Sequence, residues 1–276
     1  MKCSSGLPVR FWVFGYGSLI WKPGFSYTSK TVGYVKGFSL KFWQGNCTHR
    51  GTPEKPGRVA TLITDKNALA WGVAYEVVGP EQTEEAYEHL NMRECNLGGY
   101  QTCITDFHAH AGDDSTALVS TLPVVVYIAT EENPHYVGAS SIDTMALDIA
   151  SAEGQCGHNV EYLMKLTRFF HEEDLLDDEL FALERAVMRI LDERGVPLSS
   201  LMNHSCCPLN DVPELETSAH DRENFSAFWW EKIRSAPSWR AALEDVEKDR
   251  GSNDIESLTI CGTIKEATSK TVKVVV

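Results

Sequence analysis

The sequence predicts an α+β fold in which most strands precede most helices along the chain. Two observations predict this class. Runs rich in β-branched and aromatic residues, most of them bounded by Gly, Pro, Asn or Asp, occur before residue 130. Three segments with apolar residues at helical spacing follow between residues 142 and 193. The length of 276 residues allows one large domain, or one medium domain with an extension.

The expected strands form six runs. They span Phe11–Phe14, Val32–Trp43, Arg58–Ile63, Leu69–Val78, Thr102–Phe107 and Val124–Ala129. The longest apolar runs, such as Leu122–Ala129, are far shorter than the roughly 20 residues that a membrane-spanning helix needs. We therefore expect no segment that crosses a membrane.

A first helix is expected at Glu81–Asn91. Its apolar stripe consists of Ala86, Tyr87 and Leu90. One further turn on the same face ends at Glu94, so a carboxylate falls where the pattern calls for a core residue. Burial raises the pKa of a glutamate, which matches it to proton transfer near neutral pH. The alternative is that the helix has already ended and that Glu94 pairs with a nearby arginine.

Three further helices are expected at Ile142–Ala152, His158–Phe170 and Asp178–Glu193, and Gly195 is the stop signal after the last. The composition changes beyond that glycine. Pro, Ser, Asn and acidic residues are frequent from Val196 to Asp221, which is typical of a linker or of disorder. We therefore expect residues 195–276 to form a C-terminal extension that is partly disordered.

The segment Val13–Trp21 reads Val-Phe-Gly-Tyr-Gly-Ser-Leu-Ile-Trp, an apolar strand that leads into a turn with two glycines and a hydroxyl. Glycines let the backbone bend where a Cβ would clash, so that consecutive N–H groups converge on an anion. This turn is the expected wall of an active site. The alternative is a tight turn that closes a hairpin in an all-β core.

Three other functions of glycine-rich turns are excluded by the residues present. Ile20 occupies the place of the third glycine of a dinucleotide-binding turn. A phosphate-binding Walker loop requires Gly-Lys-Ser or Gly-Lys-Thr, and no lysine lies in this turn before Lys22. Ser18 is not followed by the second glycine of a nucleophile elbow.

Net charge and cysteine usage limit the partners and the compartment. The formal charge of −14 argues against nucleic acid, whereas a small anionic substrate remains compatible with local amides and arginines. The eight cysteines form no Cys-x-x-Cys motif and lack the density of a secreted disulfide scaffold, and residues 1–10 do not resemble a signal peptide. We expect a reducing compartment, the cytosol.

Several groups of residues, in order and with few gaps between Phe11 and Leu191, carry a resemblance to a known family. They are Phe14–Trp21, Phe42–Gly45 with His49–Gly51 and Lys55–Arg58, Trp71–Tyr75, Arg93–Glu94 with Gly98–Tyr100, and Gly157–Asn159 with Glu161–Leu163. Together they resemble ChaC proteins, the glutathione-specific γ-glutamylcyclotransferases. Residues after Gly195 have no counterpart in that family.

The resemblance implies a γ-glutamylcyclotransferase-like fold, a small mixed β-barrel with helices around it, over residues 11–194. It also implies cleavage of glutathione to 5-oxoproline and cysteinylglycine with neither a metal nor an organic cofactor. The family's catalytic glutamate corresponds to Glu94. Its substrate-binding residues correspond to Val13, Phe14, Gly15, Tyr16, Gly17, Ser18 and Tyr162; Tyr100 is a weaker candidate.

In a γ-glutamyl amide the nucleophile belongs to the substrate, because the α-amine and the γ-carbonyl carbon can close a five-membered ring. We expect Glu94 to serve first as base to the α-amine and then as acid to the leaving nitrogen. The turn amides bind either the α-carboxylate or the developing oxyanion. Tyr16 and Tyr162 supply walls or hydroxyl donors, or only pack. Arg50 and Arg58 either meet the glycine carboxylate of glutathione or brace the structure.

Two other functions remain open at this point. One is a cyclotransferase for other γ-glutamyl amines or amino acids, which would use the same turn and glutamate. The other is a catalytically silent glutathione-binding protein that acts through its extension. In each case the partner is a small molecule, neither nucleic acid nor membrane, and the sequence identifies no partner for the extension.

Overall fold

The computed structural model describes residues 10–91, 93, 99–110 and 121–202. Within these residues the strands close a barrel in the order β1-β3-β2-β4-β5. All neighbours are antiparallel except β5 and β1, which run parallel and meet at Val125 and Val13. The predicted α+β class with a small mixed barrel is confirmed. The bounds are β1 Arg10–Gly15, β2 Ser29–Asn46, β3 Gly57–Val78, β4 Gln101–Ala109 and β5 Thr121–Ile128.

Strand β3 corrects one expectation, because the two runs at 58–63 and 69–78 belong to a single strand. Pairing with β2 continues through both runs. Lys36 pairs with Leu69 and Phe38 with Thr64, so residues 65–68 bulge out of the ladder opposite Gly37 alone. The bulge is polar and largely exposed, which is why it resembles a turn in the sequence.

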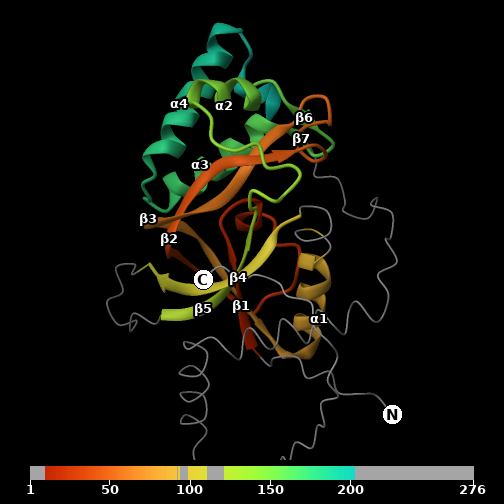
Figure 1. The fold of residues 1–276 in the computed structure, drawn as a ribbon, viewed down its shortest axis with the longest axis vertical. Coiled ribbons are helices and arrows are strands. Elements are labelled where there is room, and N and C mark those ends of the chain that lie inside the picture. The colour runs from red at the N-terminus through yellow and green to blue at the C-terminus, as the bar shows by residue number, and fades with distance from the viewer. Residues whose placement is uncertain (1–9, 92, 94–98, 111–120, 203–276) are drawn as a thin grey trace, which may run out of the picture.

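The helices lie in two places around the barrel (Figure 1). Helix α1 (Gly79–Leu90) lies beside β1. Helices α2 (Ile142–Ile149), α3 (Asn159–Glu172) and α4 (Asp178–Glu193) gather at the far end of the long β2–β3 hairpin, next to the short strands β6 (Glu153–Gly154) and β7 (Gly157–His158). All four helices fall at their predicted places. Each end agrees with the prediction to within a few residues.

Two hydrophobic clusters form the core. The larger includes Phe14 and Phe42 from the barrel together with Leu163 from α3. The second lies between the barrel and α1 and includes Val13 and Leu90. Because side chains alternate along a strand, β1 sends Phe14 into the first cluster and Val13 into the second. This alternation determines which residues of β1 reach the site described below.

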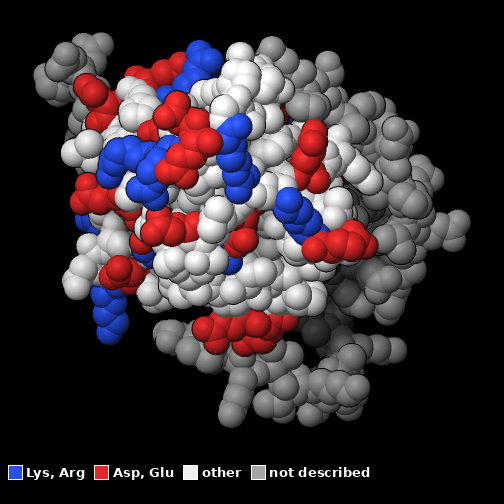
Figure 2. Space-filling view, turned by 90° about the horizontal axis from the view of Figure 1, so that it is seen from above, with Lys and Arg blue, Asp and Glu red and all other residues white. Residues whose placement is uncertain are grey.

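Charges of both signs alternate on the face seen in Figure 2, over the described residues that it colours. Several of the charged residues are paired, as are Arg189 with Asp143 at 2.8 Å and Arg168 with Glu172 at 2.7 Å. None of the helices in the described ranges combines the length and the apolar character that crossing a membrane requires.

Candidate active site

The turn that follows β1 is held by the strand next to it. After Gly15 the chain enters a short 3-10 helix, η1 (Ser18–Ile20), in which the Ile20 amide donates to the Gly17 carbonyl at 2.9 Å. The hydroxyl of Tyr75 on β3 donates to the carbonyls of Leu19 and Ile20, both at 2.9 Å. Tyr75 is almost fully buried in the second hydrophobic cluster, so the turn is anchored to a fixed side chain of β3.

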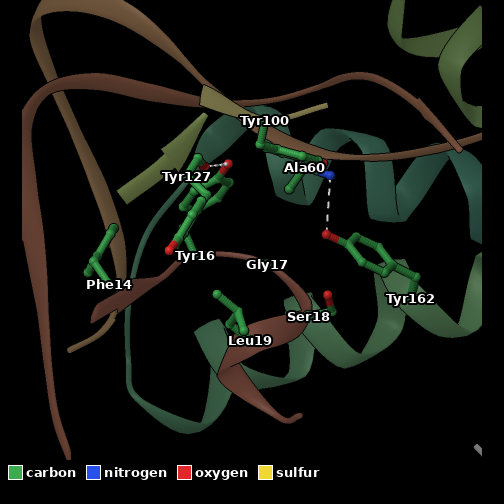
Figure 3. Close-up of a pocket in the computed structure, with 9 residues that line it drawn as sticks. All are labelled: Phe14, Tyr16, Gly17, Ser18, Leu19, Ala60, Tyr100, Tyr127 and Tyr162. Atoms are coloured by element: carbon green, nitrogen blue, oxygen red, sulfur yellow. Dashed lines mark hydrogen bonds between the residues drawn. The ribbon is translucent and has the colours of Figure 1, made fainter. Parts of the chain in front are cut away.

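A pocket with about 330 Å³ of empty space, part of it open to solvent, lies over this turn (Figure 3). Four of its lining residues are tyrosines, so apolar rings and hydroxyl groups share one concave surface, as in many small-molecule sites. Strands β1, β3 and β5, the turn and helix α3 all contribute. The lining residues are Phe14, Tyr16, Gly17, Ser18, Leu19, Ala60, Tyr100, Tyr127 and Tyr162.

Helix α3 carries Tyr162 into the pocket. The helix begins after His158, whose side chain accepts the Val160 amide at 3.2 Å. The Tyr162 hydroxyl accepts a hydrogen bond from the Ala60 amide of β3 at 3.2 Å (Figure 3). Its ring meets Trp21 edge-on at a centroid distance of 5.3 Å. Tyr162 therefore joins the helix, the strand and the region of the turn at one point.

Tyr16 forms another part of the wall. Its hydroxyl donates to the backbone carbonyl of Tyr127 at 2.5 Å, and its ring lies 6.4 Å from that of Phe14. The hydroxyl hydrogen of Tyr16 is thus donated to strand β5. The geometry therefore favours a role for Tyr16 as part of the pocket wall over a role as hydrogen-bond donor to a substrate.

The structure gathers most, but not all, of the sequence-predicted site residues. Five of them line the pocket: Phe14, Tyr16, Gly17, Ser18 and Tyr162. Val13 is fully buried in the cluster on the other face of β1. Gly15 lies between the lining residues Phe14 and Tyr16 but does not itself line the pocket. Glu94 lies outside the described residues. The weaker candidate Tyr100 does line the pocket.

Sequence reasoning missed Leu19, Ala60 and Tyr127 as lining residues. Leu19 lies within the glycine turn itself, so the turn motif is the signal that could have identified it. Ala60 and Tyr127 lie within strands and carry no local signal, because only the barrel register brings them to the turn.

Arg50 and Arg58 brace the scaffold. The Arg50 guanidinium is buried and contacts the Glu161 carboxylate at 2.6 Å and the His158 carbonyl at 3.0 Å. Arg58 contacts Asp148 at 2.7 Å. It also donates to the carbonyls of Phe42 and Gly138. These contacts favour bracing over substrate contact among the two roles that the sequence left open.

Arg93 connects the end of the α1 segment to the glycine turn. One guanidinium nitrogen donates to the Lys22 carbonyl at 2.8 Å, and another donates to the Ser18 hydroxyl oxygen. A cationic side chain thus lies directly beside a pocket-lining hydroxyl.

The surroundings of Arg93 and Lys22 are electropositive. The pKa of His49 is lowered by burial first, and then by the charges of Arg93, Lys22 and Arg50. The pKa of His89 is lowered to about 4, again by burial first and then by Arg93; Lys22 adds to this and Glu85 opposes it. The His89 imidazole is therefore neutral at pH 7, and the shift at His49 favours its neutral form. In the described ranges no three His, Cys, Asp or Glu side chains are grouped so as to hold a metal ion.

Comparison with known proteins gives consistent matches. The family described as ChaC-like protein matches residues 11–190. The chain is 44% identical over 179 residues to glutathione-specific gamma-glutamylcyclotransferase 1 of Danio rerio, covering 64% of this chain and 88% of that protein. It is 41% identical over 190 residues to the protein of the same name from Homo sapiens, covering 68% and 83%. A crystal structure of a gamma-glutamyl cyclotransferase specific to glutathione from yeast superposes with a TM-score of 0.60 at 32% identity, covering 66% of this chain and 97% of that one.

Proposed function

The chain belongs to the ChaC-like protein family, and on this premise we propose that it is a γ-glutamylcyclotransferase that cleaves glutathione to 5-oxoproline and cysteinylglycine. The observation that carries the proposal is the pocket formed by the glycine turn and Tyr162 in a chain whose relatives bear that activity in their names. A pocket of this kind suits a reaction that depends on holding one small substrate in a folded shape.

The reaction is an intramolecular displacement. The α-amine of the γ-glutamyl group loses a proton and its nitrogen bonds to the γ-carbonyl carbon. The bond from that carbon to the cysteinyl nitrogen then breaks as this nitrogen takes up a proton. Holding an intramolecular nucleophile in the correct geometry is worth about 7–11 kcal/mol of the barrier. The rigidly anchored turn and the ring walls of Tyr16 and Phe14 would supply that restraint.

Glu94 is the proposed proton carrier. It follows Arg93 directly in the chain, and Arg93 donates a hydrogen bond to the pocket-lining Ser18. One carboxyl group can serve both transfers because the attacking and leaving nitrogens flank the same carbon. General acid–base catalysis contributes about 10²–10⁴-fold, so the loss of this group is expected to reduce turnover by that range.

The remaining assignments follow the sequence. Residues 11–194 form the catalytic unit, and 195–276 form an extension that the reaction does not need. The family match over residues 11–190 supports this division. The protein acts in the cytosol, as its cysteine usage indicates.

A product assay tests the proposal. Purified protein is incubated with glutathione, γ-glutamyl-alanine and γ-glutamyl-ε-lysine, and 5-oxoproline is quantified. Of the three compounds, we expect only glutathione to be converted to 5-oxoproline. Glu94→Gln should lower this turnover by about 10²-fold or more, whereas Glu84→Gln, at an exposed position of α1, should leave it unchanged.

Two outcomes would replace the proposal by the other functions considered. Comparable rates with all three substrates would identify a cyclotransferase of broader specificity. Absence of turnover together with saturable glutathione binding would identify a binding protein.

A further inference from the structure

Arg93 and Ser18 form a pair at the edge of the pocket. Arg93 donates to the Ser18 hydroxyl oxygen and, through its other terminal nitrogen, to the Lys22 carbonyl. Lys22 is itself tied to the same turn, because its amide donates to the Ser18 carbonyl at 2.9 Å. The guanidinium therefore holds both the side chain at the start of η1 and the backbone just after η1.

This arrangement determines what the serine can do. A hydroxyl has one hydrogen to donate and two lone pairs to accept with. Since the Ser18 oxygen already accepts from a cation, its own hydrogen is directed elsewhere, and a hydroxyl polarised in this way is a stronger donor. Ser18 lines the pocket, and Figure 3 shows its oxygen directed toward the side on which Tyr162 lies.

We propose, on the basis of the proposed function, that Arg93 is a positioning residue that acts through Ser18 and fixes its hydroxyl to donate to the α-carboxylate of the γ-glutamyl group. The serine touches the substrate, and the arginine acts through the serine.

The chemistry of the surroundings favours a carboxylate over the developing oxyanion. Burial is the main cause of the lowered pKa of His49 and of His89, and the positive charges of Arg93 and Lys22 lower it further. These charges favour a group such as a carboxylate, whose full negative charge is present before the reaction begins. The α-carboxylate is attached to the same carbon as the attacking amine. Binding of the α-carboxylate would therefore orient the attacking amine, and this orientation would not depend on which amine is the leaving group.

The test compares glutathione with 4-aminobutanoyl-cysteinylglycine, which keeps the amine and the reacting carbonyl but lacks the α-carboxylate. Ser18→Ala and Arg93→Met should each lower kcat/KM for glutathione by about 10- to 100-fold, the range for a hydrogen bond to a charged group. Most of this should appear in KM, because the carboxylate is bound before and during the reaction. Neither substitution should change kcat/KM for the analogue.

Two further variants separate positioning from a general structural effect. In the Ser18→Ala background, Arg93→Met should cause no additional loss, since the arginine acts through the serine. Arg93→Lys should retain part of the activity, because an ammonium keeps the charge but lacks the planar fork that reaches two acceptors. Arg168→Met is the matched control, because Arg168 is exposed and pairs with Glu172 on the same helix, 2.7 Å away.

Calorimetric binding of both compounds in the Glu94→Gln background makes the test independent of turnover. If the wild type forms no 5-oxoproline, the proposed function fails, while the binding comparison still decides the role of Ser18. Equal weakening of both compounds by Ser18→Ala overturns the inference. The inference is also overturned if Arg93→Met lowers kcat/KM for glutathione as much in the Ser18→Ala background as in the wild type. If Arg93→Met does not fold, Ser18→Ala and Arg93→Lys still give the comparison.

Discussion

The hydroxyl of Tyr162 lies close over the α-carbon of Gly17, so that a Cβ added at Gly17 would be 2.7 Å from the hydroxyl oxygen. Real Cβ atoms do not approach another heavy atom that closely. The same hydroxyl accepts the Ala60 amide, which fixes its position on the barrel side. The absence of a side chain at residue 17 is therefore what allows helix α3 to approach the turn and form one side of the pocket.

Gly17→Ala is expected to lower kcat/KM by about 10-fold or more, because the methyl group takes pocket space and displaces the phenol that belongs to the wall. Some stability should be lost as well, because the displaced Tyr162 hydroxyl can no longer accept the Ala60 amide in the same position. Steady-state kinetics and thermal unfolding check both parts.

Gly37→Ala is the matched control. Nothing lies within 4 Å of an added Cβ there, but the φ of +82° suits only glycine. It should cost about 1 kcal/mol of unfolding free energy and leave kcat/KM unchanged. A Gly17→Ala protein with wild-type kinetics would contradict the described pocket.

Arg50 and Glu161 form a buried ion pair, and we predict that replacing either partner causes a large loss of stability. The side chains are 8% and 2% exposed, and Lys165 also contacts Glu161 at 3.1 Å. Glu161→Gln should lower the free energy of unfolding by about 3 kcal/mol, because it leaves a buried guanidinium without its counter-charge.

The exposed pair Arg168–Glu172 supplies the comparison for this effect, since its side chains are 76% and 58% exposed. Glu172→Gln should cost about 0.5 kcal/mol or less. Urea unfolding at pH 7 measures both variants, and similar small losses would mean that the buried pair is not formed.

Removal of the extension tests the proposed division of the chain. A protein that ends after Gly195 retains every described residue of the pocket and the whole family match, so kcat/KM for glutathione should be unchanged. The full-length chain, assayed in parallel, is the control. A truncated protein that folds, by circular dichroism, but has lost activity would show that the extension takes part in the reaction.

The helices were predictable because their signals are local. In α4 the apolar residues recur at helical spacing and Asp177 caps the first turn by accepting the Leu180 amide at 2.9 Å. Strand boundaries depended on distant pairing instead. Residues 65–68 look like a turn, yet β2 pairs on both sides of them and keeps β3 continuous.

The same distinction between local and distant signals applies to the residues of the site. The glycine turn is a contiguous motif, so Gly17 and Ser18 could be identified from the sequence. The role of Arg50 could not be decided there and the contact of Arg93 with the turn could not be predicted, because their partners lie far away in the chain. Arg50 meets Glu161, 111 residues further on, and Arg93 meets Ser18, 75 residues before it. Tyr127 reaches the pocket only because β5 closes the barrel against β1.

Because His89 is buried with a lowered pKa, we predict that the free energy of unfolding decreases in mild acid. Its Nε2 is buried and has no hydrogen-bond partner among the described residues, and its pKa is about 4 in the folded protein. The unfolded chain binds the proton near pH 6.5. Between these values the unfolded state carries more protons, so the free energy of unfolding falls as the pH decreases from 6.5 toward 4.

His89→Gln removes this titration. Urea unfolding of wild type and variant at several values from pH 7 to pH 4.5 should show the wild type losing stability relative to the variant as the pH falls, with a constant difference above pH 7. The glutamine has similar size and stays neutral, so packing changes shift the two curves without altering their relative slope. Parallel curves over the whole range would mean that the imidazole takes up its proton as readily in the folded protein as in the unfolded chain.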